Sequence, residues 1–410
     1  MEAAVPVPGP GREPRCGSDG LADSPAVPEN VPMDNSSALS IRPVRTRRDY
    51  RDFLDLPRGI YRDDPAWVPP IRLAEPGEYR PSGNPVLARS EHELFLARRG
   101  GIAVGRIVAY VDPRFNGYYG SRIGFFGAYE SGDDGEVARR LYAAAESWMA
   151  DRGMESSRGP IHPSAECWGF VTEGFHRPPV FLSPHNPPYY GRLAEAAGYA
   201  GVKDLLAYEA DSGAGYRIPE RFSRFAALHA SRFPGLSTRR IDLGALDRDA
   251  LHILRILNEG VAENWGYVPV EEDEMTAVVR RLRPFLDPDA VWFVEDRGSP
   301  VACCLGFPDV NVAIRRIRGK LLPLGFLRLL SVRRRVRDYR LWGLAVLPAW
   351  QGRGLDVLLY MRLFEALAPK GVRLEANYIL EDNLRIRNAL EKLGMRTVKT
   401  YRVYEKALGR

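Results

Sequence analysis

The last part of the chain repeats a succession of residues that also stands near its middle. A stretch with helical periodicity follows Asn186 and ends at Gly198, and another follows Asn383 and ends at Gly394. After each glycine, a Val-Lys pair and then a Tyr-Glu pair occur at the same offsets. The whole succession indicates that one fold occurs twice in the chain. The pairs are Val202-Lys203 and Tyr208-Glu209 in the first copy, and Val398-Lys399 and Tyr404-Glu405 in the second.

The hydrophobic pattern predicts similar elements in both copies. In the first copy, helices are expected over 48–61, 136–150 and 189–197, and strands over 93–98, 102–111, 122–129 and 201–209. In the second copy, helices are expected over 251–264, 273–286, 356–368 and 383–394, and strands over 291–296, 301–307, 344–347, 373–380 and 397–405. We therefore expect an α/β chain, which at 410 residues is long enough for two domains.

Composition sets the expected domain limits. Residues 1–40 are rich in Pro, Gly, Ser and Asp and contain hardly an apolar cluster, which predicts a disordered tail. The first domain would then cover 41–210, a short linker with Gly and Ser would cover 211–216, and the second domain would cover 217–410.

Composition also bears on partners and compartment. The formal net charge of +6 is modest for this length and does not favour a nucleic-acid partner. The four cysteines form no CxxC pair, as is typical of a reducing cytosol. There is no apolar run near the roughly 20 residues that span a bilayer and no secretory signal pattern, so we expect a cytoplasmic protein. We expect no metal either, because the spacing of four side chains matches no compact zinc pattern. These are His162, Cys167, His176 and His185.

The most informative local pattern is the stretch 341–356, which reads LWGLAVLPAWQGRGLD. An apolar strand with Leu344 and Val346 stops at Pro348, and the glycine-spaced loop 351–354 then enters a helix with an apolar stripe. A strand, a glycine loop and a helix start in this order bring several backbone N–H groups to one point. Such a point is an anion site.

The second copy resembles the GNAT N-acetyltransferase superfamily over about 218–408, with the specific match at 344–356 and 383–394. In that family, the strand before the loop separates from its neighbour, and a Q/R-x-x-G-x-G/A loop binds the pyrophosphate of acetyl-CoA. Gln351, Gly354 and the helix start fit this pattern. The resemblance thus assigns acyl-CoA binding to Leu344, Val346, Gln351, Gly352, Arg353, Gly354, Leu355, Asp356 and Asn383.

The first copy looks like a second, degenerate GNAT domain, so the chain resembles tandem-GNAT bacterial proteins of uncharacterised function. The resemblance implies two domains, each with a mixed, largely antiparallel central sheet flanked by helices. It also implies acetyl-CoA or another acyl-CoA as co-substrate, and a small-molecule or peptide amine as acceptor.

Two residues depart from the family pattern. Asp356 stands where the family has a small residue, and a carboxylate there places bulk and negative charge beside an anion. Leu390 stands where many members carry a tyrosine proposed as general acid toward the leaving thiolate. Tyr378, Tyr401 and Tyr404 are alternatives for that role, and packing within a strand is the other interpretation of each.

Acyl transfer to an amine also needs a group that takes up the amine proton. In the strand 373–380, alternation places Glu375 and Asn377 on one face and Leu374, Ala376 and Tyr378 on the other. Glu375 is the candidate base, because burial beside the thioester would raise its pKa. The alternative is that Glu375 pairs with an arginine. Our candidate catalytic residues are therefore Glu375 and Tyr378.

The first copy carries a different loop where the second has its glycines. Residues 131–135 read SGDDG, and Asp133 and Asp134 would repel a pyrophosphate. We therefore expect that the first copy does not bind CoA in this way. Its long, Pro-rich and aromatic segment 159–190 is a candidate to shape an acceptor pocket or the contact between the domains.

The segment 313–340 interleaves arginines with leucines and has one acid, Asp338. A solvated lid on the domain, a basic surface for anionic lipid or a long acyl chain, and a nucleic-acid contact such as tRNA all fit this pattern. The leading hypothesis is an acyl-CoA-dependent N-acyltransferase, most simply an N-acetyltransferase, with its active site in the second domain. A non-catalytic acyl-CoA sensor and an aminoacyl-tRNA-dependent transferase are the alternatives. The sequence predicts no oligomeric state.

Overall fold

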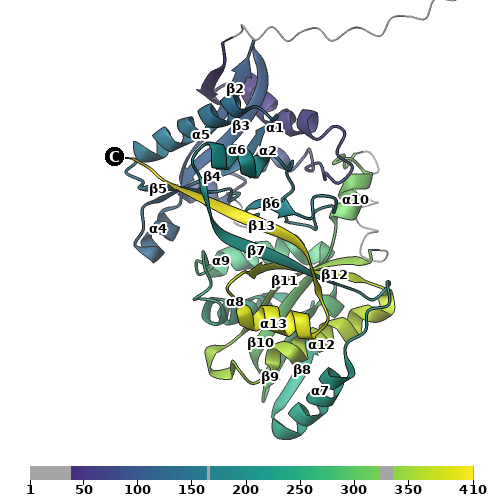
Figure 1. Ribbon diagram of the computed structural model, residues 1–410. Coiled ribbons are helices and arrows are strands. Elements are labelled where there is room, and N and C mark those ends of the chain that lie inside the picture. Colours follow the sequence, from purple (N-terminus) through teal and green to yellow (C-terminus); the bar gives the residue numbers. More distant parts are fainter. Residues whose placement is uncertain (1–37, 164–166, 323–324, 326–335, 410) are drawn as a thin grey trace, which may run out of the picture. The chain divides into compact units, whose positions relative to one another are not determined.

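The computed structural model describes residues 38–163, 167–322, 325 and 336–409 (Figure 1). The predicted tail therefore lies almost wholly outside the described residues, as does part of the basic segment. In the first half, the helices are α1 (Arg47–Ile60), α2 (Glu75–Glu78), α3 (Pro85–Arg89), α4 (Pro113–Tyr119), α5 (Gly135–Ala150) and α6 (Tyr190–Ala196). The strands are β1 (Ser40–Pro43), β2 (Glu91–Arg99), β3 (Ile102–Val111), β4 (Ile123–Ser131), β5 (Ser156–Gly159), β6 (Phe170–Glu173) and β7 (Ala200–Asp211).

The second half contains the other elements, and each predicted helix and strand is present with small shifts of its ends. The helices are α7 (Glu220–Arg232), α8 (Leu246–Gly260), α9 (Glu272–Leu282), α10 (Asn311–Arg316), α12 (Leu355–Leu367) and α13 (Leu384–Lys392). The strands are β8 (Leu236–Arg240), β9 (Val291–Asp296), β10 (Ser299–Pro308), β11 (Asp338–Val346), β12 (Arg373–Leu380) and β13 (Arg396–Ala407). The hydrophobic pattern did not predict the longer helix α7, the strand β8, or the short elements α2, α3, α4, α10, β1 and β6.

The strands of both halves join in one mixed sheet with the order β1-β2-β3-β4-β5-β13-β7-β12-β11-β10-β9-β8, and β6 adds to β13. Each half has antiparallel strands followed by one parallel pair, β4 with β5 and β11 with β12. The closing strands are exchanged: β7 of the first half pairs with β12, and β13 of the second half pairs with β5. Figure 1 shows these two long strands crossing the middle of the described part.

The exchanged strands are the two copies of the repeated succession. They pair with each other in antiparallel register, with Leu205 opposite Tyr401 and Lys203 opposite Val403. The expectation that Asn186 leads a helix as Asn383 does is wrong. The helix α6 begins at Tyr190, and the Asn186 amide oxygen instead accepts the Val171 N–H of β6 at 2.7 Å.

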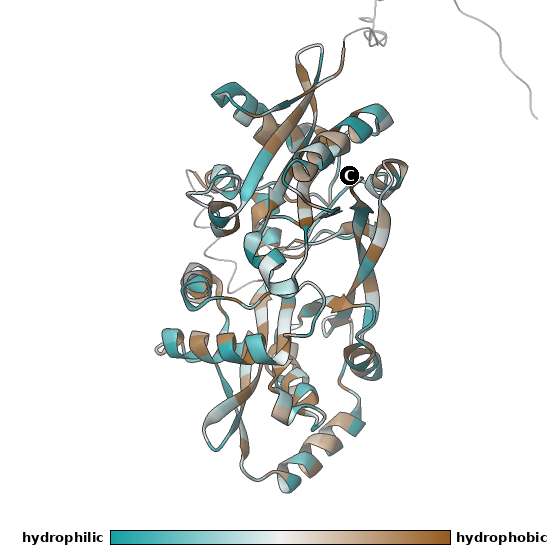
Figure 2. Ribbon diagram, turned by 90° about the vertical axis from the view of Figure 1, so that its left-hand side faces the viewer, coloured by the Kyte–Doolittle hydropathy of each residue, from teal (hydrophilic) through white to brown (hydrophobic). Residues whose placement is uncertain are grey.

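Helices cover both faces of the sheet in each half. In the second half, α12, α13 and Phe222 of α7 close one apolar core, and α8 and α9 close another on the opposite face. In the first half, α5 and α6 lie over one face and α1 over the other. Figure 2 shows the hydrophobic colour along the central strands and the hydrophilic colour on the outward sides of the helices.

Candidate active site

The strands β11 and β12 separate within the second half. They pair in parallel from Asp338 opposite Arg373 to Leu341 opposite Ala376. Beyond that point, and within the part of the chain that the structure describes, β11 pairs only with β10, and β12 pairs only with β7. The residues just past the separation, 342–344 and 378–380, are half-buried although they lie in the middle of the sheet. Backbone groups at these edges are therefore available to a ligand that enters between the strands.

The glycine loop joins the end of β11 to the start of α12. Gly352 and Gly354 both have φ of 79°, a conformation that other residues rarely adopt. Gly354 is the N-cap of α12, and no described side chain accepts a hydrogen bond from the first turn of this helix. The first turn of a helix has N–H groups without intrahelical partners. The first turn of α12 thus presents uncapped N–H groups beside the separated strands, which is the geometry that an anion site requires.

Contacts from two directions hold the loop. The Gln351 side-chain amide donates to the Val346 carbonyl at 3.2 Å, so it fixes the loop to the strand before it. On the other side, the His229 ring lies 2.8 Å from the Arg353 carbonyl oxygen, and a Cβ on Gly354 would stand 2.3 Å from the Phe225 ring. The helix α7, which was not predicted, is therefore a second support of the loop. The Arg353 guanidinium lies 4.6 Å from the centre of the Trp350 ring.

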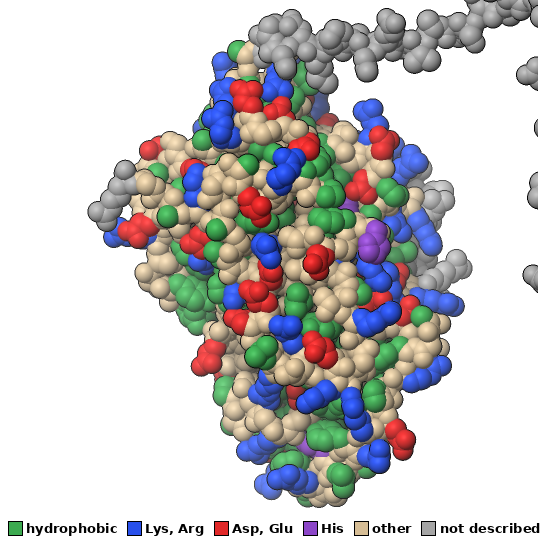
Figure 3. All heavy atoms as spheres, viewed as in Figure 1, with side chains coloured by type: hydrophobic (Ala, Val, Ile, Leu, Met, Phe, Trp, Pro, Cys, Tyr) green, Lys and Arg blue, Asp and Glu red, His purple; other side chains and the backbone are tan. Residues whose placement is uncertain are grey.

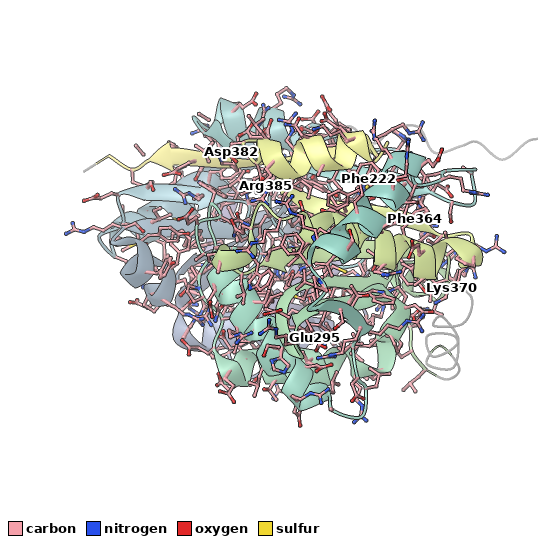
Figure 4. The ribbon with its side chains drawn as sticks, turned by 90° about the horizontal axis from the view of Figure 1, so that it is seen from below. Phe222, Glu295, Phe364, Lys370, Asp382 and Arg385 are labelled. Carbon is pink, nitrogen blue, oxygen red and sulfur yellow. The ribbon has the colours of Figure 1, made fainter. Side chains whose placement is uncertain are left out.

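The N-terminus of α13 lies at the end of β12. Asn383 caps it, with its side chain accepting the Ile386 N–H at 3.2 Å. Figure 4 shows Asp382 and Arg385 at the start of α13, and Phe222 and Phe364 together where α7 meets α12. Asp356 stands half-buried in the first turn of α12. Both strand ends therefore lead into helix N-termini.

Glu375 lies in a buried polar network on the face of β12 that meets the first half. The Arg340 side chain is completely buried, and its Nε donates to the Asn377 side-chain oxygen at 2.6 Å. The Asn377 amide in turn donates to Glu375 Oε1 at 2.9 Å and to Ser183 Oγ at 3.0 Å. Among the described residues, no arginine lies within ion-pair distance of Glu375. Burial raises the pKa of Glu375, against the positive charges of Lys399, Arg340 and Arg373.

Arg340 and Lys399 were missed as members of this network. Arg340 stands directly opposite Glu375 in the β11–β12 register. An arginine within an otherwise apolar strand was the sequence signal that could have revealed it. Lys399 belongs to the repeated Val-Lys pair, and its ammonium donates to the Pro178 carbonyl at 3.1 Å. Burial lowers the pKa of Lys399 to about 8. One terminal nitrogen of Arg340, Nη2, has no hydrogen-bond partner among the described residues.

The predicted orientation of Tyr378 is wrong. The β12–β7 register shifts between Ala376 and Ile379, and this irregularity breaks the alternation of side chains. Tyr378 therefore leaves the face of Leu374 and Ala376 and packs edge-on against Tyr401, with ring centres 5.2 Å apart. Its hydroxyl accepts the Trp168 N–H at 3.3 Å, and burial raises its pKa.

The other positions considered for a general acid lie in apolar cores. Leu390 is fully buried in the core beneath α12 and α13. Tyr401 is also fully buried, behind Tyr378. Tyr404 belongs to the core of the first half, because the strand exchange carries the end of β13 there. Tyr378 is thus the tyrosine that lies at the separated strands.

Described residues of the segment 159–190 of the first half lie against this face. The Phe181 and Leu182 carbonyls accept from the Arg340 guanidinium at 2.7 and 2.6 Å. Trp168 packs edge-on against Trp265, which lies between α8 and α9, with ring centres 6.0 Å apart. Both tryptophans join Tyr378, Val268 and Leu380 at one apolar cluster. Side chains of both halves therefore surround the end of β12.

The corresponding helix start in the first half is closed by its own sequence. The Asp134 carboxylate accepts the N–H groups of Glu136 and Val137 at 2.9 and 3.1 Å, so it caps α5. Asp133 pairs with Arg192. A carboxylate therefore occupies the place where an anion would bind in α12.

Among the described residues, no group of three or more His, Cys, Asp and Glu side chains could hold a metal ion. His185 instead lies 2.7 Å from the Asp64 carboxylate. Within the same residues, none of the helices combines the length and apolar character needed to cross a membrane.

Comparison with known proteins places the chain in a family. The model of the Acetyltransferase (GNAT) family matches residues 257–395. A protein of Caulobacter vibrioides named bacterial ceramide synthase is 34% identical over 388 residues, covering 92% of this chain and all of that protein. The chain belongs to the GNAT superfamily. The protein YghO of Escherichia coli is 31% identical over 382 residues, covering 90% of this chain and 95% of that protein.

Solved structures show the same tandem GNAT architecture. A tandem GNAT protein from the clavulanic acid biosynthesis pathway aligns with a TM-score of 0.53 and 13% identity, covering 91% of this chain and 99% of that one. A GCN5-related N-acetyltransferase from Sphaerobacter thermophilus aligns with a TM-score of 0.52 and 15% identity, covering 91% and 96%. At these identities the likeness concerns the fold. GNAT enzymes transfer an acyl group from a CoA thioester, so this fold supports an acyl-CoA co-substrate and an amine acceptor.

Proposed function

We propose that the protein is an N-acyltransferase that moves a fatty acyl group from a CoA thioester to the amine of a long-chain molecule. The observation that carries the acyl-CoA part is the uncapped N-terminus of α12 beside the separated strands β11 and β12. The long-chain part draws on the relative named bacterial ceramide synthase, since a ceramide is the amide of a fatty acid and a long-chain amino alcohol. The apolar cluster of Trp168, Trp265 and Tyr378 supports it.

The proposed chemistry assigns a role to each element. Backbone N–H groups of 351–356 bind the pyrophosphate, and the free edges past Leu341 and Ala376 receive the pantetheine arm. The amine nitrogen attacks the thioester carbon, the C–S bond breaks, and the ammonium proton leaves through Glu375, directly or through water. The raised pKa of Glu375 suits a proton acceptor. The Tyr378 hydroxyl gives its proton to the CoA thiolate and regains one from water, and Glu375 releases the amine proton to water, so both side chains return to their starting states.

Calorimetric titration with acetyl-CoA and with a long-chain acyl-CoA tests the proposal. Gly354→Glu introduces a side chain against Phe225 and a negative charge at the anion site, and should weaken binding by about a hundredfold or more. Gly132→Glu is the matched control in the first half, where a Cβ meets nothing within 4 Å, and binding should stay unchanged. Absence of binding to the unaltered protein would overturn the proposal.

Release of free CoA thiol separates an enzyme from a sensor. Long-chain amino alcohols should give faster release than short amines, and Glu375→Gln should slow it by about a hundredfold with acyl-CoA affinity unchanged. Binding without thiol release from any amine of the panel would favour the acyl-CoA sensor. Fastest release with a short amine would keep the transferase and remove the long-chain acceptor.

A further inference from the structure

A basic surface with exposed leucines lies where two distant segments meet beside α10. We call it the α10 surface and define it by residues of 72–73 and 316–322. The Arg72 N–H donates to the Gly319 carbonyl at 3.1 Å, and a Cβ on Gly319 would stand 2.2 Å from the Pro70 carbonyl oxygen. Only a glycine permits this approach, so the two segments form one surface. Its exposed side chains are Arg72, Leu73, Arg316, Arg318, Lys320 and Leu322.

A small apolar core holds the α10 surface next to the candidate active site. Val68 and Ile71 of the first half pack against Ala313 and Ile314 of the second half. Phe181 joins the same core, and its carbonyl accepts from the buried Arg340 guanidinium at 2.7 Å. Through Phe181, the core beneath the surface therefore also contacts the polar network around Glu375.

The basic side chains of the α10 surface lack counter-charges. Among the described residues, none lies in ion-pair contact with Arg72, Arg316, Arg318 or Lys320. About half of the described arginines elsewhere pair with a carboxylate, as Arg98 does with Asp49 and Asp52. Figure 3 shows Lys and Arg side chains gathered at the right-hand edge, where α10 lies. The positive charge of this surface is therefore available to an anionic partner.

The two leucines indicate which anionic partner this is. Leu73 and Leu322 are each 76% exposed, which leaves two large apolar side chains in water among the cations. Basic side chains that lie at the headgroups beside apolar side chains that enter the acyl region are the pattern of a membrane-surface contact. A nucleic acid would use the cations and would leave the leucines without a role.

We propose that the α10 surface docks on the anionic surface of a lipid bilayer, and so brings the candidate active site to an acceptor that resides in the membrane. The purpose of this docking rests on the proposed function, since only a long-chain substrate requires that the protein bind a membrane. The docking itself is a separate property that is measured without any reaction.

Flotation with phosphatidylcholine vesicles, with and without phosphatidylglycerol, tests the docking on the full chain. The protein should float with the anionic vesicles at low salt and lose this binding at high salt. Arg316→Glu/Arg318→Glu/Lys320→Glu should lower the partition coefficient at least tenfold, as each basic side chain near such a surface is worth about fivefold. Arg42→Glu/Arg51→Glu/Arg139→Glu changes the net charge equally at exposed positions of the first half and should lower it much less.

A second variant tests the leucines without changing charge. Leu73→Ser/Leu322→Ser should lower the partition into anionic vesicles by about tenfold, because two apolar side chains no longer enter the bilayer. Equal losses for the α10 and control charge variants, or no flotation of the unaltered protein, would overturn the docking. Binding of tRNA without flotation would assign the surface to a nucleic acid. Flotation without thiol release would keep the docking and remove the proposed transferase, and thiol release without flotation would do the reverse.

Discussion

The starts of α5 and α12 are equivalent positions in the two copies, yet a carboxylate caps the first and no side chain caps the second. At α5, the Asp134 carboxylate caps the first turn and is itself held by Arg99 at 2.7 Å. At α12, Gly354 occupies the cap position without a side chain, and the first turn is uncapped. The two copies thus share the order of strand, loop and helix, and the residue at the N-cap decides whether a side chain of the protein occupies the first turn.

The two copies also depend on each other, because neither half supplies the last strand of its own part of the sheet. The exchanged strands β7 and β13 make each half depend on the other for its last strand. The first half therefore contributes to the structure of the second half. It supplies the strand beside β12 and the segment that covers Glu375.

The largest expected effect follows from this exchange. A chain that ends at Met395 lacks β13 and with it the buried side chains of Tyr401, Val403 and Tyr404. Each costs about 3 kcal/mol, so the loss approaches or exceeds the total stability of an ordinary domain, about 5–15 kcal/mol. We expect both halves to lose native structure, seen as loss of the cooperative thermal transition by circular dichroism. A chain that starts at Leu39 is the truncation control and should keep the transition. A folded first half in the shorter chain would show that the halves are independent.

This exchange is also the feature that the sequence could not predict. The strands β7 and β13 carry the same Val-Lys and Tyr-Glu pairs, so each fits either sheet, and local alternation does not choose between them. The elements themselves have strong periodicity, and β12 occurs over the expected residues. The helix α7 was missed because the pattern of its sequence does not show that it packs on a loop more than a hundred residues away.

The site was predicted to a similar extent. The glycine loop and the Asn383 cap lie where the pattern placed them, because glycines with positive φ and capping residues act locally. The face of β12 from which the Tyr378 side chain projects was not predictable, because the register shift arises from the pairing of β12 with β7. The network of Arg340 and Glu375 depends on the parallel β11–β12 register in the same way.

A second prediction compares two buried aspartates. Asp309 lies where the first half covers the second half, and Asp287 lies in the interior of the second half. Asp309 accepts the Phe181 N–H at 2.9 Å, and burial with nearby acids raises its pKa to about 7. Asp287 lies 2.8 Å from the Lys370 ammonium and accepts the Tyr339 hydroxyl at 2.7 Å; these partners lower its pKa against the opposing effect of burial.

The two aspartates should respond to pH with opposite signs. Asp309 has a higher pKa in the folded protein, about 7, than in the unfolded chain, about 4. Its contribution to the free energy of unfolding is therefore fully present below pH 4 and is lost as the pH rises to about 7. Asp309→Asn should therefore raise the free energy of unfolding by about 2 kcal/mol at pH 8 and hardly change it at pH 4. Asp287→Asn should lower the free energy of unfolding at pH 8 by about 1–2 kcal/mol. This loss should become smaller as the pH falls through the lowered pKa of Asp287 in the folded protein. Denaturant unfolding at both pH values measures this, and equal signs at pH 8 would contradict it.

The third prediction concerns the cap itself. Asp134→Ala removes two charge-assisted hydrogen bonds from the first turn of α5 and should lower the free energy of unfolding by about 1 kcal/mol. The pKa of Asp134 is lowered by hydrogen bonds from Val137 and Arg99, which outweigh burial. The difference from the unaltered protein should therefore hold above the unfolded pKa near 4 and vanish as the pH falls through the folded pKa. Acyl-CoA affinity should not change, and a gain of a second binding site would show that the cap alone silences the first half.

The smallest effect is expected at Asp356, the one acid in the first turn of the open helix. Its charge favours the helix N-terminus but opposes a pyrophosphate bound there. Asp356→Asn should therefore raise acyl-CoA affinity about threefold in calorimetric titrations at low salt, and the gain should shrink as salt screens the charge. Glu365→Gln, at an exposed position on the same helix that pairs with Arg362, is the charge-matched control and should leave affinity unchanged. A fall in affinity for Asp356→Asn would mean that the carboxylate accepts a hydrogen bond from the ligand. The open helix would then owe its specificity to the very residue in which it departs from the family pattern.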